Sequence, residues 1–343
     1  MKEFPNSVRE VRLKSHPNGL PTKHDFIVEA VSLHSECDRP ILVKNLYTRI
    51  SGSIRMMITE GASDVPGVPF PSLRPGDVLA EESLGVVVSA PEIAHMPIGA
   101  LVVHHRGFRE FSCLARDECR RVDDCLPDRA AHLSHGWTAY AALTNGANLV
   151  CGETVLITNA GGAIGSMAGQ LARLLGAGRI VGTAGSEEKA RRLEKDCGYD
   201  AVVVRSSHDF SSALHSAAPC GVDVMLDSVG GEQLTAGIDV ANERARIVLA
   251  GALSGQLAPT GVGRAAPVSL DSFPIILKRL QLVGYSADDD SDQRGEWENR
   301  LAEWLNQELI QFPSTRFSGI EAAPEAIEAV VHGKTFGTVI LAY

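Results

Sequence analysis

The stretch ETVLITNAGGAIGSMAGQLARLL, from Glu153 to Leu175, decides the fold. Its first residues, Thr154 to Thr158, are rich in β-branched side chains and predict a strand. A glycine turn follows from Ala160 to Gly165, and apolar residues at helical spacing then predict a helix that runs to Leu175. A strand, a glycine turn and a helix in this order are typical of the first half of a dinucleotide-binding βαβ unit.

The glycine turn has the spacing A-x-G-x-x-G, with Ala160 where a first glycine usually stands. Gly162 would let the backbone approach a pyrophosphate, and Gly165 would let the helix pack closely on the strand. The free N–H groups and the positive dipole end of the helix would then face the phosphates. Glycine turns also join strands to helices in proteins that bind no phosphate, so the motif alone leaves that alternative open.

Length, composition and charge narrow the class of protein. The 343 residues predict about two domains, each with its own core. With 44% hydrophobic and 22% charged residues, the composition is that of a soluble globular protein. The formal net charge of −10 argues against nucleic acid or an anionic membrane as partner. No apolar run reaches the ~20 residues of a membrane span, and the first residues lack the apolar core of a signal peptide.

The seven cysteines are an odd number scattered along the chain. This usage predicts reduced thiols and a cytoplasmic protein. Cys151 and Cys220 are predicted to be buried small hydrophobic residues rather than nucleophiles.

Neither cysteines nor histidines have the spacing of a metal site. Cys113, Cys119 and Cys125 have five residues between neighbours, too many for a structural zinc knuckle. No Gly-His-Glu stretch offers a catalytic zinc site, and the adjacent pair His104-His105 would point to opposite faces of a strand. The sequence therefore predicts that the protein holds no metal.

The pattern of predicted secondary structure divides the chain into two parts. Residues 1–125 contain short segments of strand character broken by Gly and Pro, which predicts a barrel-like antiparallel domain, and residues 311–343 are expected to return to it. Residues 126–310 alternate strands with helices, which predicts a doubly wound parallel sheet of the Rossmann type. Strands are expected over 25–30, 41–47, 85–89, 100–104, 154–158, 179–183, 201–204, 223–227, 245–250, 281–285 and 338–342, and amphipathic or terminal helices over 296–310 and 324–331.

The end of the second strand of the parallel sheet indicates which nicotinamide cofactor would bind. A sheet that prefers NAD usually carries Asp or Glu there, to hold the ribose 2′-hydroxyl. In this chain the strand 179–183 is followed by Ala184-Gly185-Ser186, with no carboxylate. Lys189 lies in the next helix and Arg205 ends the third strand, so cations are available for a 2′-phosphate. We therefore expect NADPH.

The helix that follows Ser186 also carries residues that weaken the case for NADPH. Glu187 and Glu188 precede Lys189, although acidic residues are normal in a first helical turn. Lys189, Arg191 and Arg192 could also form a solvated helix face.

Short matches along nearly the whole chain resemble one family. They are VKNLY (43–47), GFREFS (107–112), TAY (138–140), AIGS (163–166), AGS (184–186) with Lys189, DSVGG (227–231), GALS (251–254) and FG (336–337). On these motifs the chain resembles the zinc-independent branch of the medium-chain dehydrogenase/reductase superfamily. Within that branch it is similar to the group of prostaglandin reductases, plant double-bond reductases and curcumin reductases.

The resemblance implies a fold, an assembly and a set of cofactor contacts. A GroES-like antiparallel β-barrel catalytic domain would lie beside the Rossmann domain, with the active site in the cleft between them, in a homodimer. The pyrophosphate would be held by Gly162, Ala163, Ile164 and Gly165, and the 2′-phosphate end by Gly185, Ser186, Lys189 and Arg205. The ribose and nicotinamide end would be lined by Ser228, Ala250, Gly251, Leu253, Ser254, Tyr285, Ser286 and Thr335.

The resemblance also implies a reaction, in which a hydride from NADPH is added to the β-carbon of an α,β-unsaturated ketone or aldehyde. A hydrogen-bond donor at the carbonyl oxygen stabilises the charge that develops there. Relatives commonly present tyrosines at two places, where this chain has Ser53 and Gln256. Both can donate hydrogen bonds, but neither is a useful acid near neutral pH. Tyr285, His135 and Tyr47 are candidates to compensate, with packing of a satisfied polar side chain as the alternative for each.

The leading hypothesis is an NADPH-dependent reductase of the C=C bond of a small unsaturated carbonyl compound. A quinone or carbonyl reductase on the same fold is an alternative, and a nucleotide-binding protein whose active site has decayed is another. The absence of both tyrosines widens the predicted pocket and changes its polarity, so we expect a substrate unlike simple alkenals.

Overall fold

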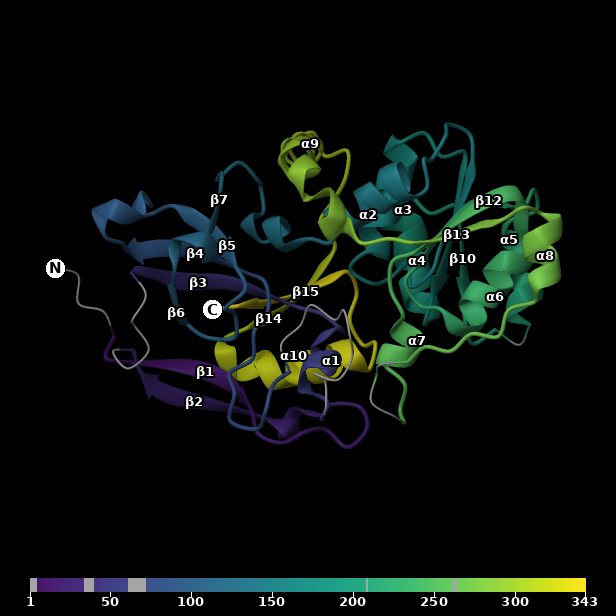
Figure 1. Cartoon of the computed structure of the whole chain (residues 1–343). Helices are drawn as coiled ribbons and strands as arrows, with labels where there is room; N and C mark the ends of the chain where they lie inside the picture. The colour runs from purple at the N-terminus through teal and green to yellow at the C-terminus, as the bar shows by residue number, and fades with distance from the viewer. Residues whose placement is uncertain (1–4, 34–39, 61–71, 208, 261–262, 264) are drawn as a thin grey trace.

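The computed structural model describes residues 5–33, 40–60, 72–207, 209–260, 263 and 265–343 (Figure 1). A six-stranded parallel sheet has the order β10-β9-β8-β11-β12-β13, so the chain winds outward in both directions from β8. This order confirms the predicted doubly wound sheet of the Rossmann type. Its strands are β8 (Thr154–Ile157), β9 (Arg179–Ala184), β10 (Ala201–Val204), β11 (Val222–Asp227), β12 (Ala241–Leu249) and β13 (Gln281–Gly284).

Helices cover both faces of this sheet, because each face carries its own apolar cluster. One cluster joins the sheet to α2 (Gly136–Ala141), α3 (Gly165–Leu174), α4 (Glu187–Asp196) and α9 (Arg294–Asn306). The other joins it to α5 (Phe210–Ala217), α6 (Gly231–Asp239) and α8 (Ser272–Leu277). The short helix α7 (Leu253–Gln256) follows β12.

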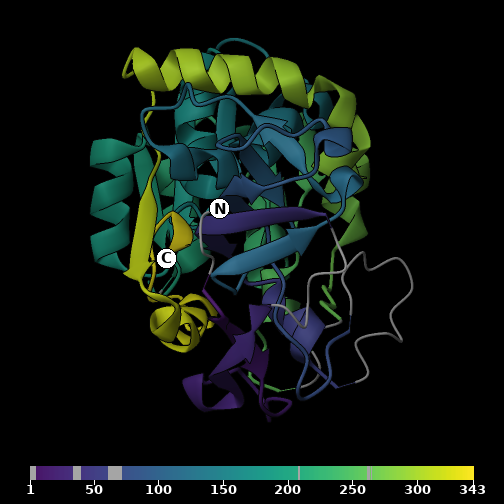
Figure 2. The same cartoon turned by 90° about the vertical axis from the view of Figure 1, so that its left-hand side faces the viewer.

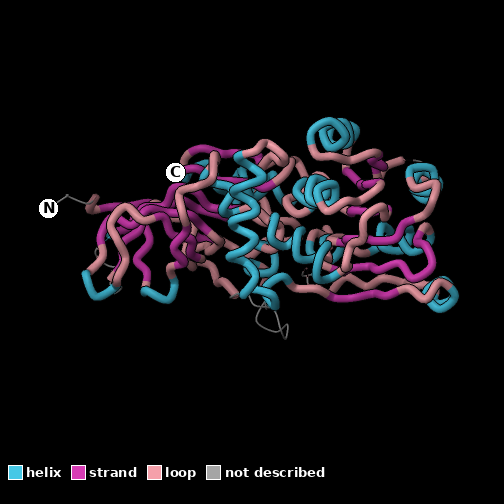
Figure 3. Tube along the Cα trace, turned by 90° about the horizontal axis from the view of Figure 1, so that it is seen from above, coloured by secondary structure: helices cyan, strands magenta, loops and turns pink. Residues whose placement is uncertain are grey.

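The second part of the molecule is strand-rich and lies beside the first, as the view from above shows (Figure 3). Its main sheet has the order β14-β15-β3-β4-β5-β7, and β6 also pairs with β3. A separate antiparallel pair joins β1 (Ser7–Leu13) to β2 (Phe26–Ser32). The other strands are β3 (Ile41–Ile50), β4 (Ser83–Ser89), β5 (Leu101–His104), β6 (Phe111–Leu114), β7 (Arg120–Val122), β14 (Ser314–Ser318) and β15 (Thr338–Ala342), and the helices are α1 (Ile54–Ile58) and α10 (Ala323–Val331).

The last strand of the chain joins the main sheet of the strand-rich part. β15 pairs antiparallel with β3, which places Ala342 opposite Tyr47. The long helix α9 precedes this strand and lies across the top of the molecule (Figure 2). Within the described ranges, no helix combines the length and apolar character needed to cross a bilayer.

The helix predicted over 296–310 is shorter than expected. α9 ends at Asn306, and Glu308 has a positive φ of 57° that stops helical continuation. Leu309 therefore lies beyond the helix and is 51% exposed. Strand β12 begins at Ala241, before the predicted strand 245–250, because the polar residues 242–244 lack strand character in the sequence. The pairing of β12 with β11 is irregular over the same stretch.

Three cysteine predictions are wrong. Cys113 is disulfide-bonded, whereas the sequence predicts reduced thiols. Cys151 and Cys220 are exposed rather than buried, because each precedes a positive-φ glycine at a surface turn. The count and spacing of cysteines could not show which thiol sits against another in space. The cytoplasmic location stays a prediction.

His104 illustrates how the strand-rich part satisfies a buried polar side chain. It is 1% exposed. Nδ1 accepts a hydrogen bond from the N–H of Arg106 at 3.1 Å, so Nε2 carries the proton and donates to Oδ1 of Asn45 at 2.9 Å. Burial lowers the pKa of His104 to about 3.

This arrangement predicts a pH-dependent stability. The folded pKa lies below the ~6.5 of an unfolded histidine, so stability is present above that value and is lost as the pH falls toward 3. Between pH 7 and pH 5, the free energy of unfolding of the native protein should fall by ~2 kcal/mol more than that of His104→Gln. Urea unfolding at both pH values measures this, with exposed His95→Asn as control. Parallel pH profiles for the native protein and His104→Gln would contradict it.

Candidate functional site

The carboxyl ends of the parallel strands bring together the residues predicted at the ribose and nicotinamide end. Ala250 N–H donates to the carbonyl of Asp227 at 2.7 Å, and Leu253 N–H donates to the carbonyl of Ser228 at 3.1 Å. Tyr285 N–H donates to the carbonyl of Leu249 at 3.1 Å. Loops after β11, β12 and β13 therefore lie side by side at this edge, where open parallel sheets bind ligands.

The carboxylate of Asp227 fixes the loop after β11. The side chain is fully buried and accepts hydrogen bonds from Thr158 Oγ1 at 2.7 Å and from the N–H groups of Val229 and Gly230 at 3.1 and 2.8 Å. Burial raises the pKa of Asp227 despite these bonds. The loop that carries Ser228 is thus anchored from beneath.

The glycine turn has the close packing that a dinucleotide site requires. A Cβ on Gly165 would lie 2.5 Å from both Asn159 O and Ala160 Cα, so only glycine lets α3 begin this close to the turn. A Cβ on Gly162 would lie 2.4 Å from Asn159 Nδ2. The N–H groups of Ser166 and Met167 donate to the carbonyls of Gly162 and Ile164 at 3.0 and 3.2 Å. Among the described hydrogen bonds, none uses the N–H groups of residues 163–165, so the turn at the start of α3 offers a cradle that fits a pyrophosphate.

The residues predicted at the 2′-phosphate lie together at the end of β9. Ser186 is the N-cap of α4 and accepts from Lys189 N–H at 3.3 Å, which leaves its hydroxyl proton free for another acceptor. Burial, followed by the charge of nearby Arg205, lowers the pKa of Lys189. A Cβ on Gly185 would meet no atom within 4 Å. Two cations thus border an open space beside a helix N-terminus.

The returning C-terminal segment closes over the glycine turn. Gly337 N–H donates to the carbonyl of Gly161 at 2.9 Å, and Lys189 Nζ donates to the carbonyl of Gly333 at 2.6 Å. The guanidinium of Arg192 lies 3.9 Å from the centre of the Phe336 ring, a cation–π contact that gives Arg192 a packing role. Thr335 is half-buried within this segment.

Ser53 and Gln256, predicted to replace the two tyrosines, belong to segments that meet across the two parts. Gln256 Nε2 lies 3.6 Å from Met56 Sδ. A Cβ on Gly52 would lie 3.4 Å from Leu253 Cδ2. The start of α1 therefore faces α7 and the loop after β12, which carries the predicted nicotinamide residues.

The structure gives Tyr285 and His135 other neighbours. The Tyr285 hydroxyl donates to Asp290 Oδ2 and lowers the pKa of that carboxyl, so its only proton is already engaged. His135 is the N-cap residue of α2, and its buried Nδ1 has no hydrogen-bond partner among the described residues. Burial lowers the pKa of His135 to about 3, so it is neutral near pH 7. No described contact joins either residue to Ser53 or Gln256.

A buried ion network lies beside His135. Glu82 is 3% exposed, and its carboxylate lies 2.8 Å from Arg49 and 3.2 Å from Arg294 of α9. Although burial opposes ionisation, the two arginines lower the pKa of Glu82 to about 2. This network ties β3 and the start of β4 to α9.

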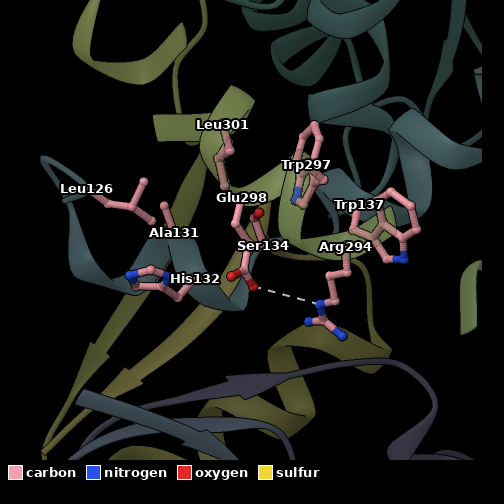
Figure 4. Close-up of a pocket in the computed structure, with 9 residues that line it drawn as sticks. All are labelled: Leu126, Ala131, His132, Ser134, Trp137, Arg294, Trp297, Glu298 and Leu301. Atoms are coloured by element: carbon pink, nitrogen blue, oxygen red, sulfur yellow. Dashed lines mark ion pairs between the residues drawn. The ribbon is translucent and has the colours of Figure 1, made fainter. Parts of the chain in front are cut away.

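A small pocket lies between α9 and the segment that leads into α2 (Figure 4). Arg294 Nε and Glu298 Oε1 are 4.0 Å apart at its edge. Its lining comprises Leu126, Ala131, His132, Ser134, Trp137, Arg294, Trp297, Glu298 and Leu301, none of which is a predicted cofactor or catalytic residue. We therefore place the candidate site at the sheet edge rather than in this pocket.

Ser51 and Glu81 lie next to Ser53 in the candidate site, and the sequence did not predict them there. Ser51 Oγ donates to Glu81 Oε1 at 2.5 Å and lies 2.5 Å from Ser53 Oγ. A single carboxylate before a strand belongs to no spacing motif, so only the folded structure shows this contact.

The described part of the chain contains no group of three or more His, Cys, Asp or Glu side chains that could hold a metal ion.

Comparison with known proteins supports the same architecture. Residues 163–307 match the family model described as zinc-binding dehydrogenase, and residues 9–122 match the N-terminal domain of oxidoreductase. Prostaglandin reductase 1 of Bos taurus is 32% identical over 340 residues, which cover 96% of this chain and 97% of that protein. The NADPH-dependent curcumin reductase of Escherichia coli (strain K12) is 26% identical over 339 residues, which cover 96% of this chain and 95% of that protein.

A solved structure agrees over the whole fold. The crystal structure of CurA from Vibrio vulnificus in complex with NADPH has a TM-score of 0.85 at 26% identity, covering 97% of this chain and 98% of that one. The chain therefore belongs to the medium-chain dehydrogenase/reductase superfamily, in the zinc-independent group of the prostaglandin and curcumin reductases. This membership confirms the resemblance inferred from the sequence motifs.

Proposed function

We propose that the protein is an NADPH-dependent reductase that acts on the C=C bond of an α,β-unsaturated carbonyl compound. The observation that carries this proposal is the meeting of the start of α1 with α7, which sets Ser53 and Gln256 beside the loop after β12. Both side chains can donate a hydrogen bond to a carbonyl oxygen. The relatives named as prostaglandin and curcumin reductases support the choice of substrate class.

The cofactor would lie along the edge of the parallel sheet, with the N-terminus of α3 at its pyrophosphate and Lys189 and Arg205 at its 2′-phosphate. When bound, NADPH would supply the hydride. Ser53 and Gln256 would orient the substrate carbonyl and stabilise the negative charge that develops on its oxygen, an effect worth ~10²–10³ in rate for a well-placed donor. Residues 1–125 with 311–343 would form the catalytic domain, and residues 126–310 the dinucleotide-binding domain.

Oxidation of NADPH, followed at its absorbance band with a panel of enones, quinones and saturated ketones, tests the proposed reaction. We expect turnover with enones and a product in which the C=C bond is reduced and the carbonyl is retained. Preferred turnover of quinones or saturated ketones would instead support the alternative reductase. Tight NADPH binding without turnover of any compound would indicate a decayed site.

We also propose a homodimer in which a second copy covers α8 and β13. Within the described sheet, β13 is an edge strand whose outer side has no strand partner. Next to it Phe273, Ile276 and Leu277 are 70%, 68% and 71% exposed. An unpaired edge strand beside an apolar surface is a ready template for pairing with another chain.

Charge placed on this surface should therefore separate the copies. The double variant Ile276→Arg/Leu277→Arg is expected to sediment as a monomer at concentrations where the native protein is a dimer, because two arginines would be buried without partners. Ile98→Arg alters an equally exposed residue away from this surface and serves as control. A native protein that is itself monomeric, or a double variant that stays dimeric, would contradict the assignment.

A further inference from the structure

A continuous hydrogen-bonded path leads from a buried carboxyl to a partly exposed hydroxyl. Glu81 is 8% exposed, and its Oε1 accepts from Ser51 Oγ at 2.5 Å. Ser51 Oγ lies 2.5 Å from Ser53 Oγ, and both serines are half-buried. The three groups therefore form one chain in the order Glu81, Ser51, Ser53.

Glu81 differs from its neighbour Glu82 in its surroundings. Glu82 is held between Arg49 and Arg294. Among the described residues, no cation forms an ion pair with Glu81, whose other carboxylate oxygen lies 3.4 Å from the N–H of Glu82. The carboxyl of Glu81 is thus the one of the two that is not committed to an ion pair, and its main side-chain partner is a hydroxyl that can pass a proton on.

The outer end of this path lies at the candidate site. A Cβ on Gly52, which separates the two serines, would lie 3.4 Å from Leu253 Cδ2, so this turn faces α7. Arg55 of α1 donates from Nη1 to the carbonyl of Ala258 at 2.8 Å, and this bond holds α1 against the segment after α7. Ser53 is therefore positioned by contacts that cross between the two parts of the molecule.

We propose that Glu81, acting through Ser51 and Ser53, supplies the proton that completes reduction of the unsaturated carbonyl compound; this inference rests on the proposed function. The direction of the hydrogen bonds follows the state of Glu81. When Glu81 is ionised, Ser51 donates to it and Ser53 donates to Ser51. When Glu81 is protonated, each hydroxyl can turn, and Ser53 directs its proton toward the substrate.

The step balances without a further reactant. Hydride from NADPH forms a C–H bond at the β-carbon, the C=C π bond breaks, and its electron pair is held as an enolate. Ser53, hydrogen-bonded to the carbonyl oxygen, gives its proton to that oxygen, Ser51 gives its proton to Ser53, and the Glu81 carboxyl gives its proton to Ser51. The enol that results becomes the saturated carbonyl compound by proton exchange with water. Glu81 is left as a carboxylate and regains one proton from solvent. In this scheme Ser53 is the catalytic residue, while Ser51 and Glu81 act through it.

The test compares an enone with a nitroalkene. Reduction of a nitroalkene by hydride leaves a nitronate, a stable anion that needs no proton from the enzyme. The variants are Glu81→Gln, Ser51→Ala and Ser51→Thr, the last of which keeps the hydroxyl. We expect Glu81→Gln and Ser51→Ala to lower kcat for the enone by roughly 10²-fold, in the range of general acid catalysis. Their nitroalkene rates and NADPH affinities should stay within about twofold of the native values, and Ser51→Thr should restore most of the enone rate.

The outcomes separate this inference from the proposed function. If the native protein reduces nitroalkenes and enones but the variants lose both equally, Glu81 has only a structural role and the inference is overturned. Unchanged enone rates in Glu81→Gln would also overturn it while leaving the proposed function intact. If the native protein binds NADPH but reduces no enone, the proposed function fails and the inference falls with it.

Discussion

Replacing Gly165 by alanine is expected to weaken NADPH binding by at least roughly 100-fold. The new Cβ would lie 2.5 Å from backbone atoms of Asn159 and Ala160, which cannot rotate away as a flexible side chain could. The start of α3 would have to move from the end of β8, and the N–H groups of the glycine turn would leave the proposed pyrophosphate site. Loss of two or three charge-assisted hydrogen bonds corresponds to a change of this size.

The same substitution should cost some stability, about 1–3 kcal/mol, as is usual when a close-packed site is overfilled. Fluorescence titration with NADPH and urea unfolding measure the two effects separately. Gly295→Ala is a matched control, because a Cβ there meets no atom within 4 Å and the residue lies in helix α9. If Gly165→Ala binds NADPH as the native protein does, the glycine turn is not the pyrophosphate site.

Replacing Lys189 by methionine should remove the preference for NADPH while leaving NADH binding nearly unchanged. Methionine keeps the apolar stem that packs on Gly161, where a Cβ would lie 3.2 Å from Lys189 Cδ, but it lacks the charge. A hydrogen bond between charged groups is worth about 1.5–3 kcal/mol, so Kd for NADPH should rise roughly 10- to 150-fold. Kd for NADH should stay within about twofold, because NADH lacks the phosphate.

Isothermal titration with both cofactors checks this expectation. Lys195→Met in the last turn of the same helix, α4, removes an exposed charge without altering the candidate site and serves as control. Equal losses of NADPH and NADH affinity in Lys189→Met would show that Lys189 supports the fold of the site rather than the 2′-phosphate.

Much of the fold could be predicted from the sequence, because its signals are local. The glycine turn after β8 and the alternation of strands with helices give the doubly wound sheet, and Ser186 is an N-cap by residue type and position. The end of α9 could not be predicted, because apolar periodicity continues past Asn306 although the backbone turns at Glu308. Periodicity records which residues would suit a helix, not where the chain leaves one.

In the candidate site, too, some residues have local sequence signals and others are brought together only by the fold. The predicted cofactor residues lie next to strand ends and glycines, which are local signals that a sequence shows. The path from Glu81 to Ser53 depends on a contact between residues 30 positions apart, and no local pattern predicts such a contact. Tyr285 and His135 are residue types that often take part in catalysis, but the structure gives them other roles. The Tyr285 hydroxyl donates to Asp290, and His135 is buried.

The proposal that the edge of the parallel sheet binds a dinucleotide with a 2′-phosphate is tested most directly by titrating the purified native protein with NADPH and with NADH under identical conditions. The structure predicts that NADPH binds at least roughly tenfold more tightly, since Lys189 and Arg205 border the space beyond Ser186. Equal affinity for the two cofactors, or binding of neither, would contradict the proposed site.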